Sequence, residues 1–414
     1  MTTSPMAASR PQNSRGRVFR RAYGVVLAVT LLASVATPGM ATARTLTGQD
    51  RPELQQAIQA VADSGIAGVQ LRVHDKKGDW VGSAGVRTLG ESAKPPTDGR
   101  FRIGSTTKPF TATVVLQLVG EGKIGLDTPV ATYLPDFGFD RRITVRMVLQ
   151  HTSGLFNFTG EYNADGTVVP GIPWSGKEWV DNRFHTYQPQ QLVRLALSQP
   201  LRFAPGTNWS YSNTNYVVAR LLIEKVTGRS YADQVQRRIL RPLGLRDTVV
   251  PGTSPEIPGP HADSYYRYQD GDQWKTVDVT RQNPSWISSA GEIISTTKDI
   301  NTFISALLGG KLLAPALLAE MLKPHATTDP TSDYGLGLFE LRADANCSGT
   351  VLINHPGGVQ GSATAMYSTL DGSTTMEASL TYVDSVTPPG AALQQAQQNL
   401  IKLVFCGGGE STRH

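Results

Sequence analysis

The chain of 414 residues is long enough for one large domain or two smaller ones with a substantial buried core. Its composition is globular, with 39% hydrophobic and 18% charged residues and with glycine and proline spread along the chain, which excludes a repeat or low-complexity protein. The formal net charge is +5, and residues 1–43 contain five arginines and no acidic residue. The rest of the chain is therefore near neutral, and we expect no nucleic-acid partner.

Residues 1–43 have the pattern of a secretory signal peptide. A basic stretch precedes an apolar run from about Tyr23 to Val35, and the small residues Ala41 to Ala43 form a cleavage site before Arg44. The apolar run is shorter than the roughly 20 residues that a spanning helix needs, so a stable membrane anchor is the less favoured alternative. We therefore expect a secreted, extracellular protein, and a pair of arginines leaves the twin-arginine export route open.

Apolar periodicity predicts an opening helix and two strands. Apolar residues recur at helical spacing over 51–63, and strand signals follow at 68–74 and 80–86. A helix that begins at Gly104-Ser105 and runs to about Val119 is apolar on nearly all sides. Such a helix is expected to be buried.

The middle of the chain, from about Leu126 to Asn283, carries mainly helix signals separated by loops with proline and glycine. The predicted helices cover 145–150, 190–198 and 215–227. Strand signals return only after Leu338, and they predict strands at 351–354, 364–368 and 376–383 before a terminal helix near 391–404.

Strands at both ends of the chain with helices between them predict an α/β fold. We expect a discontinuous body made of residues 44–103 and 287–414. Residues 104–286 are then a mostly helical insert, which carries the candidate nucleophile helix and a second motif.

Ser105 and Lys108 form an S-x-x-K pattern at the start of the buried helix. Residues three apart share a helix face, so Lys108 should project beside Ser105. The N–H groups of a helix N-terminus also favour negative charge near Ser105. The pattern occurs again at Ser295 to Lys298, where Ser295 or Thr296 is interpreted as a helix N-cap because no tyrosine or histidine motif follows.

Tyr211 and Asn213 flank Ser212, so both side chains can point into one cleft from an extended segment. Lysine and tyrosine have ordinary pKa values near 10.4 and near 10, so the pKa of either Lys108 or Tyr211 must fall by about 3 for that residue to accept a proton at neutral pH. Burial and proximity can change pKa values by this much. Residue type alone does not distinguish which of the two is the general base.

His355 to Gly358 follow a predicted apolar strand and precede another. Glycines there allow close approach of a substrate, and the N–H of Gly358 is a candidate second oxyanion donor. A simple turn at Pro356-Gly357 is the alternative interpretation.

Together these motifs resemble the serine β-lactamase and penicillin-binding protein superfamily, in the branch with tyrosine in the second motif, and especially its exocellular D-alanyl-D-alanine carboxypeptidases. The resemblance implies an antiparallel sheet flanked by helices plus an inserted, mostly helical domain. It covers almost all of the chain after the signal-like segment, through these stretches: 101–104, 151–155, 204–206, 211–215, 283–286, 289–291, 334–338 and 355–361.

The resemblance also implies roles for single residues. Ser105 is the acylated nucleophile, Lys108 and Tyr211 are the proton-transfer pair, and Asn213 binds the substrate amide. The implied oxyanion donors are Ser105 and Gly358, and His151 is structural.

Three further positions are expected to bind substrate. His355 stands where many relatives carry lysine, so activity on anionic substrates is expected to fall from pH 6 to 8 as its charge is lost. Gly357 is expected beside the substrate in the same motif. Trp286 is interpreted as a cleft wall for an apolar acyl chain, with core packing as the alternative.

The chain departs from the carboxypeptidases where they hold the terminal carboxylate of their substrate. Pro356, Gly358, Phe339 and Val168 replace the polar anchors expected there. We therefore expect a more apolar leaving-group pocket that favours esters, amides or D-peptides without a free carboxylate. Arg342 is a possible substitute anchor that keeps carboxypeptidase activity open.

Cys347 and Cys406 are the only cysteines, and an even count in an exported protein favours a disulfide. This bond would tie the terminal helix to the body. Two buried free thiols are the alternative.

The sequence thus predicts a secreted serine hydrolase that forms an acyl-enzyme, in first place a D-alanyl-D-alanine carboxypeptidase-like peptidase. A β-lactamase, an esterase or a D-amino-acid amidase is the alternative within the fold, and a non-hydrolytic penicillin- or peptidoglycan-binding protein is the alternative of another class. The expected substrate is a small peptide, ester or β-lactam. We expect no metal or cofactor and a monomeric protein.

Overall fold

A computed structural model describes residues 51–162, 167–342, 347, 349–382 and 390–406. The signal-like segment lies outside these ranges, so the expected secretory signal and its cleavage site stay predictions. The described residues belong to one compact unit. The boundaries of the expected insert, residues 104–286, also stay a prediction.

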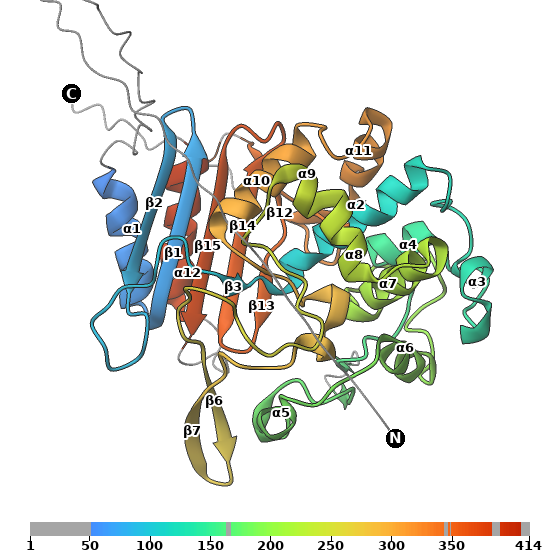
Figure 1. Cartoon of the computed structure of the whole chain (residues 1–414), viewed down its shortest axis with the longest axis horizontal. Coiled ribbons are helices and arrows are strands. Elements are labelled where there is room, and N and C mark those ends of the chain that lie inside the picture. The colour runs from blue at the N-terminus through green and yellow to red at the C-terminus, as the bar shows by residue number, and fades with distance from the viewer. Residues whose placement is uncertain (1–50, 163–166, 343–346, 348, 383–389, 407–414) are drawn as a thin grey trace, which may run out of the picture. The chain divides into compact units, whose positions relative to one another are not determined.

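A nine-stranded antiparallel sheet forms the centre of the fold (Figure 1). Eight strands follow the order β2-β1-β15-β14-β12-β11-β10-β9, and β13 pairs with β14. Strands from the two ends of the chain are thus neighbours, because β1 pairs with β15. The strands are β1 Ile66–Asp75, β2 Gly78–Gly85, β9 His325–Ala326, β10 Ser332–Tyr334, β11 Phe339–Arg342, β12 Val351–Asn354, β13 Gly357–Val359, β14 Ser362–Thr369 and β15 Thr375–Tyr382.

Alternating side chains give this sheet two buried faces. On one face, Val69, Leu71 and Val73 of β1 join a hydrophobic cluster with residues of α1 (Pro52–Asp63) and α12 (Ala391–Phe405). On the other face lies α10 (Thr297–Leu308), from which Asn301 donates a hydrogen bond to the Thr375 hydroxyl. The predicted antiparallel sheet flanked by helices is confirmed.

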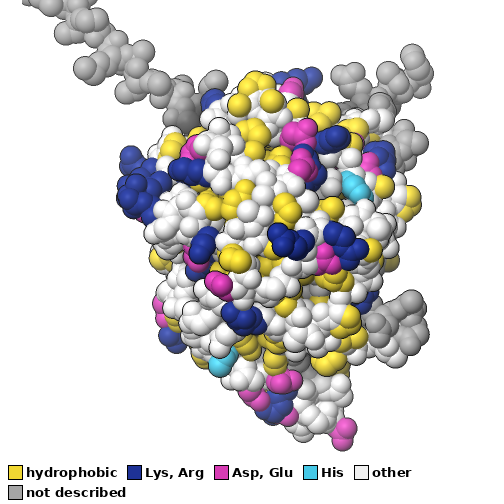
Figure 2. Space-filling model, turned by 90° about the vertical axis from the view of Figure 1, so that its right-hand side faces the viewer, with side chains coloured by type: hydrophobic (Ala, Val, Ile, Leu, Met, Phe, Trp, Pro, Cys, Tyr) yellow, Lys and Arg dark blue, Asp and Glu magenta, His cyan; other side chains and the backbone are white. Residues whose placement is uncertain are grey.

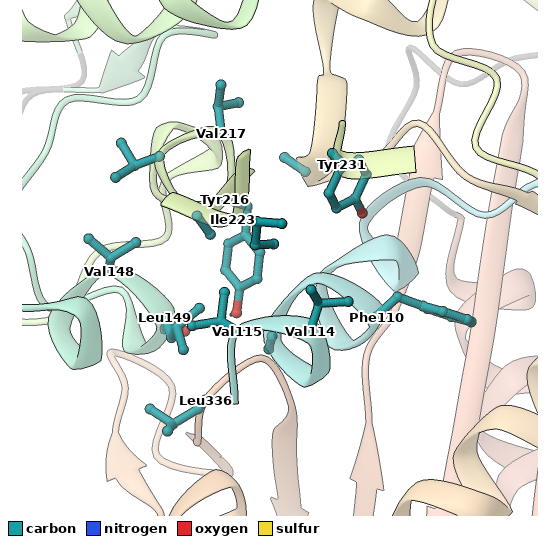
Figure 3. Packing of buried hydrophobic residues seen from close by; sticks show 14 of the residues in the cluster. Phe110, Val114, Val115, Val148, Leu149, Tyr216, Val217, Ile223, Tyr231 and Leu336 are labelled. Carbon is teal, nitrogen blue, oxygen red and sulfur yellow. The ribbon is translucent and has the colours of Figure 1, made fainter. Parts of the chain in front are cut away.

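Helix α2 packs against α7 and α8 and is buried along most of its length, as its apolar sequence predicts. Figure 3 shows Val114 and Val115 of α2 among side chains of α4 and α7. The remaining helices are α2 Thr107–Gly120, α3 Val130–Tyr133, α4 Val145–Gln150, α5 Gly176–Asn182, α6 Pro189–Leu197, α7 Asn213–Thr227, α8 Tyr231–Val235, α9 Arg241–Leu243 and α11 Pro315–Leu322. Short helical turns lie at η1 Gly104–Thr106, η2 Pro135–Phe137, η3 Gln236–Leu240, η4 Pro284–Trp286 and η5 Ser288–Ala290.

The expectation that strands return only after Leu338 is wrong. An antiparallel hairpin of β6 (Tyr265–Asp270) and β7 (Gln273–Asp278) protrudes from the fold (Figure 1). Its two-residue Gly271-Asp272 loop between strands with aromatic residues is a hairpin signal. The other strands before Leu338 that the prediction omitted have only two or three residues, too few for a periodic pattern. Besides β9 and β10 of the large sheet, they form two short pairs, β3 Phe101–Arg102 with β8 Ile294–Ser295 and β4 Glu161–Tyr162 with β5 Val168–Val169.

Cys347 and Cys406 form the predicted disulfide, with their Cα atoms 4.8 Å apart. It links the end of α12 to the segment before β12. Within the part of the chain that the structure describes, no helix is both long and apolar enough to cross a membrane. On the face shown in Figure 2, basic side chains lie beside acidic ones.

Candidate active site

Ser105 lies in the turn η1, directly before the buried helix α2. The preceding Gly104 has a φ of 52°, and a Cβ atom there would lie 2.5 Å from the backbone nitrogen of Gly358. Both the left-handed backbone and the close contact therefore require glycine at this position. The result is that Ser105 faces β13, the strand of the third motif.

Lys108 lies one helical turn after Ser105 and is fully buried. Its Nζ atom lies 3.0 Å from Ser105 Oγ, 2.9 Å from Asn213 Oδ1 and 2.9 Å from the Ala290 carbonyl oxygen. Burial lowers the pKa of the Lys108 ammonium well below its ordinary value. A neutral amine can donate to Asn213 and Ala290 and accept the Ser105 hydroxyl proton.

Tyr211 is half-buried and contacts the same two residues. Its phenol makes a side-chain hydrogen bond with Ser105, and Lys108 Nζ lies 4.7 Å from the centre of its ring. Burial raises the pKa of the Tyr211 phenol, and the hydrogen bond with Ser105 opposes this only in part. The two shifts have opposite directions, and they favour Lys108 as the proton acceptor with Tyr211 protonated.

The third motif packs directly on the nucleophile turn. Thr106 Oγ1 donates a hydrogen bond of 2.9 Å to the His355 carbonyl. A Cβ atom on Gly357 would lie 1.9 Å from the Ile103 carbonyl oxygen, so Gly357 is a packing residue at this contact. Its expected place beside the substrate stays a prediction. Gly358 is exposed and lines the cleft beside Ser105, as expected for an oxyanion donor.

His355 differs from its expected role. Its side chain is buried, with Nε2 3.2 Å from the Tyr334 hydroxyl and Nδ1 2.8 Å from the Pro356 carbonyl oxygen. Burial lowers its pKa to about 3, with a further contribution from Lys108. This burial favours the neutral imidazole, so it argues against the expected loss of positive charge between pH 6 and 8.

His151 has the contacts of a structural residue. It is buried at the end of α4, and its Nδ1 accepts a hydrogen bond of 3.2 Å from the Ser212 N–H. The side-chain amide of Asn215 lies 3.0 Å from the same nitrogen. His151 thus holds the segment that carries Tyr211 and Asn213.

A cleft of about 510 Å³ opens in front of Ser105. Its lining includes Asn213, Gly358 and Trp286, three of the residues predicted to bind substrate. Trp286 is only 6% exposed, so it contributes to the core as well as to the cleft wall. The wall also contains Val168, one of the residues expected to make the leaving-group pocket apolar. Further apolar residues of the wall were indicated by no motif, namely Pro170, Ile172, Pro173 and Trp174.

Two carboxylates, Glu161 and Glu178, line the same cleft, whereas its described lining contains no lysine or arginine. Glu161 accepts a hydrogen bond of 3.0 Å from the Asn157 N–H, and Arg202 lies 3.7 Å away. Burial raises the pKa of the Glu161 carboxyl. No sequence motif indicates either acid, because single glutamates in the two-residue strand β4 and on the short helix α5 form no pattern.

Arg342 does not supply the missing carboxylate anchor. Its guanidinium pairs with Asp333 at 2.5 Å and also donates to the Pro330 carbonyl. In the sheet Phe339 lies opposite Asn354, whereas Arg342 lies opposite Val351, three residues further from the third motif. Phe339 contributes an aromatic ring 5.3 Å from that of His355, so this position is apolar.

The second S-x-x-K pattern is a helix cap, as predicted. Thr296 Oγ1 accepts a hydrogen bond of 3.1 Å from the Asp299 N–H at the start of α10, and Ser295 lies in the short strand β8. Among the described residues, no group of three or more His, Cys, Asp or Glu side chains is arranged to hold a metal ion.

Known proteins match this chain in sequence and in fold. The model of the Beta-lactamase family matches residues 54–381. In sequence, the chain is 28% identical over 299 residues to penicillin-binding protein 4* of Bacillus subtilis, covering 70% of this chain and 62% of that protein. It is 35% identical over 156 residues to D-aminopeptidase of Brucella ovis, covering 37% of this chain and 27% of that protein. The chain therefore spans less than two thirds of these relatives.

A solved structure matches over a larger share. The D-stereospecific amidohydrolase from Streptomyces sp. has 36% sequence identity and a TM-score of 0.75, and the match covers 87% of this chain and 100% of that chain.

Proposed function

The chain belongs to the beta-lactamase family, and from this premise we propose that it is a serine hydrolase that acts through an acyl-enzyme on D-configured substrates. Its preferred substrates are amides and esters of D-amino acids and D-peptides whose leaving group carries no carboxylate. The single observation that carries this specificity is the cleft in front of Ser105, which has two carboxylates and an apolar wall.

In the proposed reaction, the Ser105 hydroxyl attacks the substrate carbonyl and its proton passes to the neutral Lys108 amine, 3.0 Å away. The N–H groups of Ser105 and Gly358 stabilise the resulting oxyanion. The leaving amine or alcohol departs with a proton from the Lys108 and Tyr211 pair, and the acyl group stays on Ser105. Water then attacks this ester through the same pair, and Ser105 recovers its proton.

The charges of the cleft support a substrate without a free carboxylate. Glu178 repels a carboxylate and attracts an ammonium group, whereas Arg202, 3.7 Å from Glu161, compensates part of the charge of that second carboxylate. Arg342 is paired with Asp333. The similarity to a D-stereospecific amidohydrolase along its whole length supports the D configuration and the amide bond.

The test compares D-phenylalanine amide, its L isomer, and a D-alanyl-D-alanine peptide with a free or an amidated C-terminus. We expect turnover of the D-amide and at least about tenfold higher kcat/KM for the amidated peptide, equivalent to about 1.4 kcal/mol. Ser105→Ala should remove the activity. A clear preference for the free acid, or for the L isomer, would contradict the proposal.

D-alanyl-D-alanine carboxypeptidase activity is the second candidate. The completeness of the three motifs and the similarity to penicillin-binding protein 4* favour it. Incubation with a fluorescent penicillin separates the remaining possibilities. A stable adduct on Ser105 supports a penicillin-binding peptidase, rapid turnover supports a β-lactamase, and an adduct without any hydrolase activity supports a non-hydrolytic binding protein.

We also propose that the protein is exported with cleavage near Arg44. Mass analysis of the N-terminus of the protein from the culture medium tests this step. An uncleaved protein confined to cells would contradict it.

A further inference from the structure

A buried turn, residues 288–292, supplies one of the three hydrogen-bond partners of the Lys108 amine. Its central carbonyl, that of Ala290, lies 2.9 Å from Lys108 Nζ. The neighbouring Ser289 connects the turn to two helices, since its carbonyl accepts a hydrogen bond from Thr111 of α2 and its hydroxyl donates to the Tyr216 carbonyl of α7. The turn begins at Ser288, which has a left-handed φ of 49°, an uncommon conformation for a residue other than glycine.

A partly buried ion pair of Arg220 and Glu292 holds both ends of this turn. Arg220 of α7 donates from Nη1 to Ser288 Oγ at 3.1 Å and to Glu292 Oε1 at 3.2 Å. Glu292 is 1% exposed, and its second carboxylate oxygen accepts a hydrogen bond of 3.1 Å from the Gly252 N–H. The Glu292 N–H closes the turn by donating to the Ser288 carbonyl at 2.8 Å. Arg220 therefore contacts the residues two before and two after Ala290.

We propose that Arg220 and Glu292 are positioning residues for acyl transfer, which keep the Ala290 carbonyl on Lys108 by holding the turn 288–292. Neither residue lines the cleft, so they act through Lys108 and not on the substrate. The inference rests on the proposed function only for the role of Ser105 and Lys108, and it is independent of which substrate is preferred.

Electrostatics support a positioning role over a purely stabilising one. Burial raises the pKa of Glu292 to about 7, although Arg220 opposes this shift. A buried ion pair gives little net stability, because the desolvation of its charges cancels much of their attraction. What the pair does provide is a fixed geometry, because Glu292 has partners on both carboxylate oxygens.

Glu224 provides a matched control. It pairs with Arg220 Nε at 3.0 Å and accepts a hydrogen bond from the Tyr231 N–H, but no hydrogen bond or ion pair in the described structure joins it to the turn. Glu224→Gln thus removes one carboxylate from the same arginine and leaves the contacts of Ser288 and Glu292. Ser288→Gly is a mild second variant, since it tolerates the left-handed φ and removes only the hydroxyl that Arg220 contacts.

The experiment measures hydrolysis of p-nitrophenyl acetate and the rate at which a fluorophosphonate probe labels Ser105, with thermal unfolding alongside. For Glu292→Gln we expect a kcat lower by roughly 10- to 100-fold, KM within twofold, and slower labelling. This loss is smaller than the roughly 100- to 10,000-fold contribution of a general acid-base group, because Glu292 acts on Lys108 only through the turn. In this variant the Ala290 carbonyl is no longer held on Lys108, and that carbonyl favours the charged form of the amine. The pKa of Lys108 should therefore fall, and the acid limb of the pH profile of kcat should move to lower pH by about one unit.

Ser288→Gly should lower kcat severalfold with the same shift in the pH profile, and Glu224→Gln should keep kcat within twofold whatever its Tm. Wild-type rates and pH profiles in folded Glu292→Gln and Ser288→Gly would overturn the proposal, as would equal losses in Glu224→Gln. If the wild type hydrolyses the ester but no D-amide, only the proposed substrate fails. If the wild type neither hydrolyses the ester nor labels at Ser105, both proposals fail.

Discussion

Burial acts in opposite directions on the two proton-transfer partners of Ser105. It favours the uncharged form of both, which means that Lys108 loses a proton while Tyr211 keeps one. Residue types alone leave this assignment open, because the ordinary pKa values of lysine and tyrosine are almost equal. The difference comes from where each side chain lies in the folded protein.

His355 gives a pH prediction at the same scale. Because its pKa is lowered to about 3, the imidazole is neutral from pH 6 to 8 and contributes no inflection to kcat/KM there. A buried neutral histidine contributes stability above its unfolded pKa near 6.5, and this contribution is lost as the pH falls from 6.5 toward 3. NMR titration of the imidazole should show no protonation above pH 5.

The matched variant is His355→Gln, whose amide can still bond to Tyr334 and to the Pro356 carbonyl. Its kcat/KM should have the same shape between pH 6 and 8 as that of the wild type. A wild-type inflection near 6.5 that disappears in His355→Gln would show that the histidine is charged in the active protein after all.

At the scale of elements, the backbones of the nucleophile turn η1 and of strand β13 pack directly against each other, with no side chains between them. Gly104 and Gly357 lie on the two sides of this contact, and neither has room for a Cβ atom. Adjacent Gly358 has open space, since a Cβ atom there would have the Ser362 carbonyl oxygen as its nearest neighbour, at 4.0 Å. This asymmetry distinguishes a packing glycine from a cleft glycine within one motif.

The two glycines give a paired prediction. Gly357→Ala should lower the free energy of unfolding by about 1 to 3 kcal/mol or more, because its Cβ would overlap the Ile103 carbonyl and force the backbone apart. Gly358→Ala should change it by less than about 0.5 kcal/mol. Urea denaturation followed by circular dichroism measures both, and equal effects in the two variants would contradict the assignment.

At the scale of the whole molecule, the C-terminal helix α12 covers one face of the sheet, whose strands come from both ends of the chain. It packs with α1 on one face, and the Cys347–Cys406 disulfide ties its end to the segment before β12. The active site lies elsewhere, among η1, α2, α7 and β13. Stability and catalysis should therefore be separable at this bond.

Removing the disulfide tests that separation. The bond closes a loop with a sequence separation of 59, and loop-closure entropy gives about 4 kcal/mol as an upper guide for its contribution. The double variant Cys347→Ser, Cys406→Ser should unfold at lower denaturant concentration, while ester turnover at 25 °C stays within twofold. Unchanged stability, or a loss of kcat in the folded variant, would contradict this prediction.

Features that depend on neighbours along the chain could be predicted from the residues alone. Apolar periodicity predicted α4 and β12 at their observed bounds, cap chemistry identified Thr296, and the spacing of Ser105 and Lys108 put them on one helix face. These features need only local geometry. The motifs likewise indicated the family.

The environment of those residues, in contrast, is set by tertiary contacts. Two hydrogen-bond partners of Lys108, Asn213 and Ala290, lie 105 and 182 residues further along the chain. The neutral state of His355, the acidic wall of the cleft and the pairing of Arg342 with Asp333 likewise depend on which segments pack together. The charge states of Lys108 and His355 and the preference of the cleft for its substrates follow from burial and from residues that are distant in the sequence. No local sequence pattern predicts them, because the contacts exist only in the folded protein.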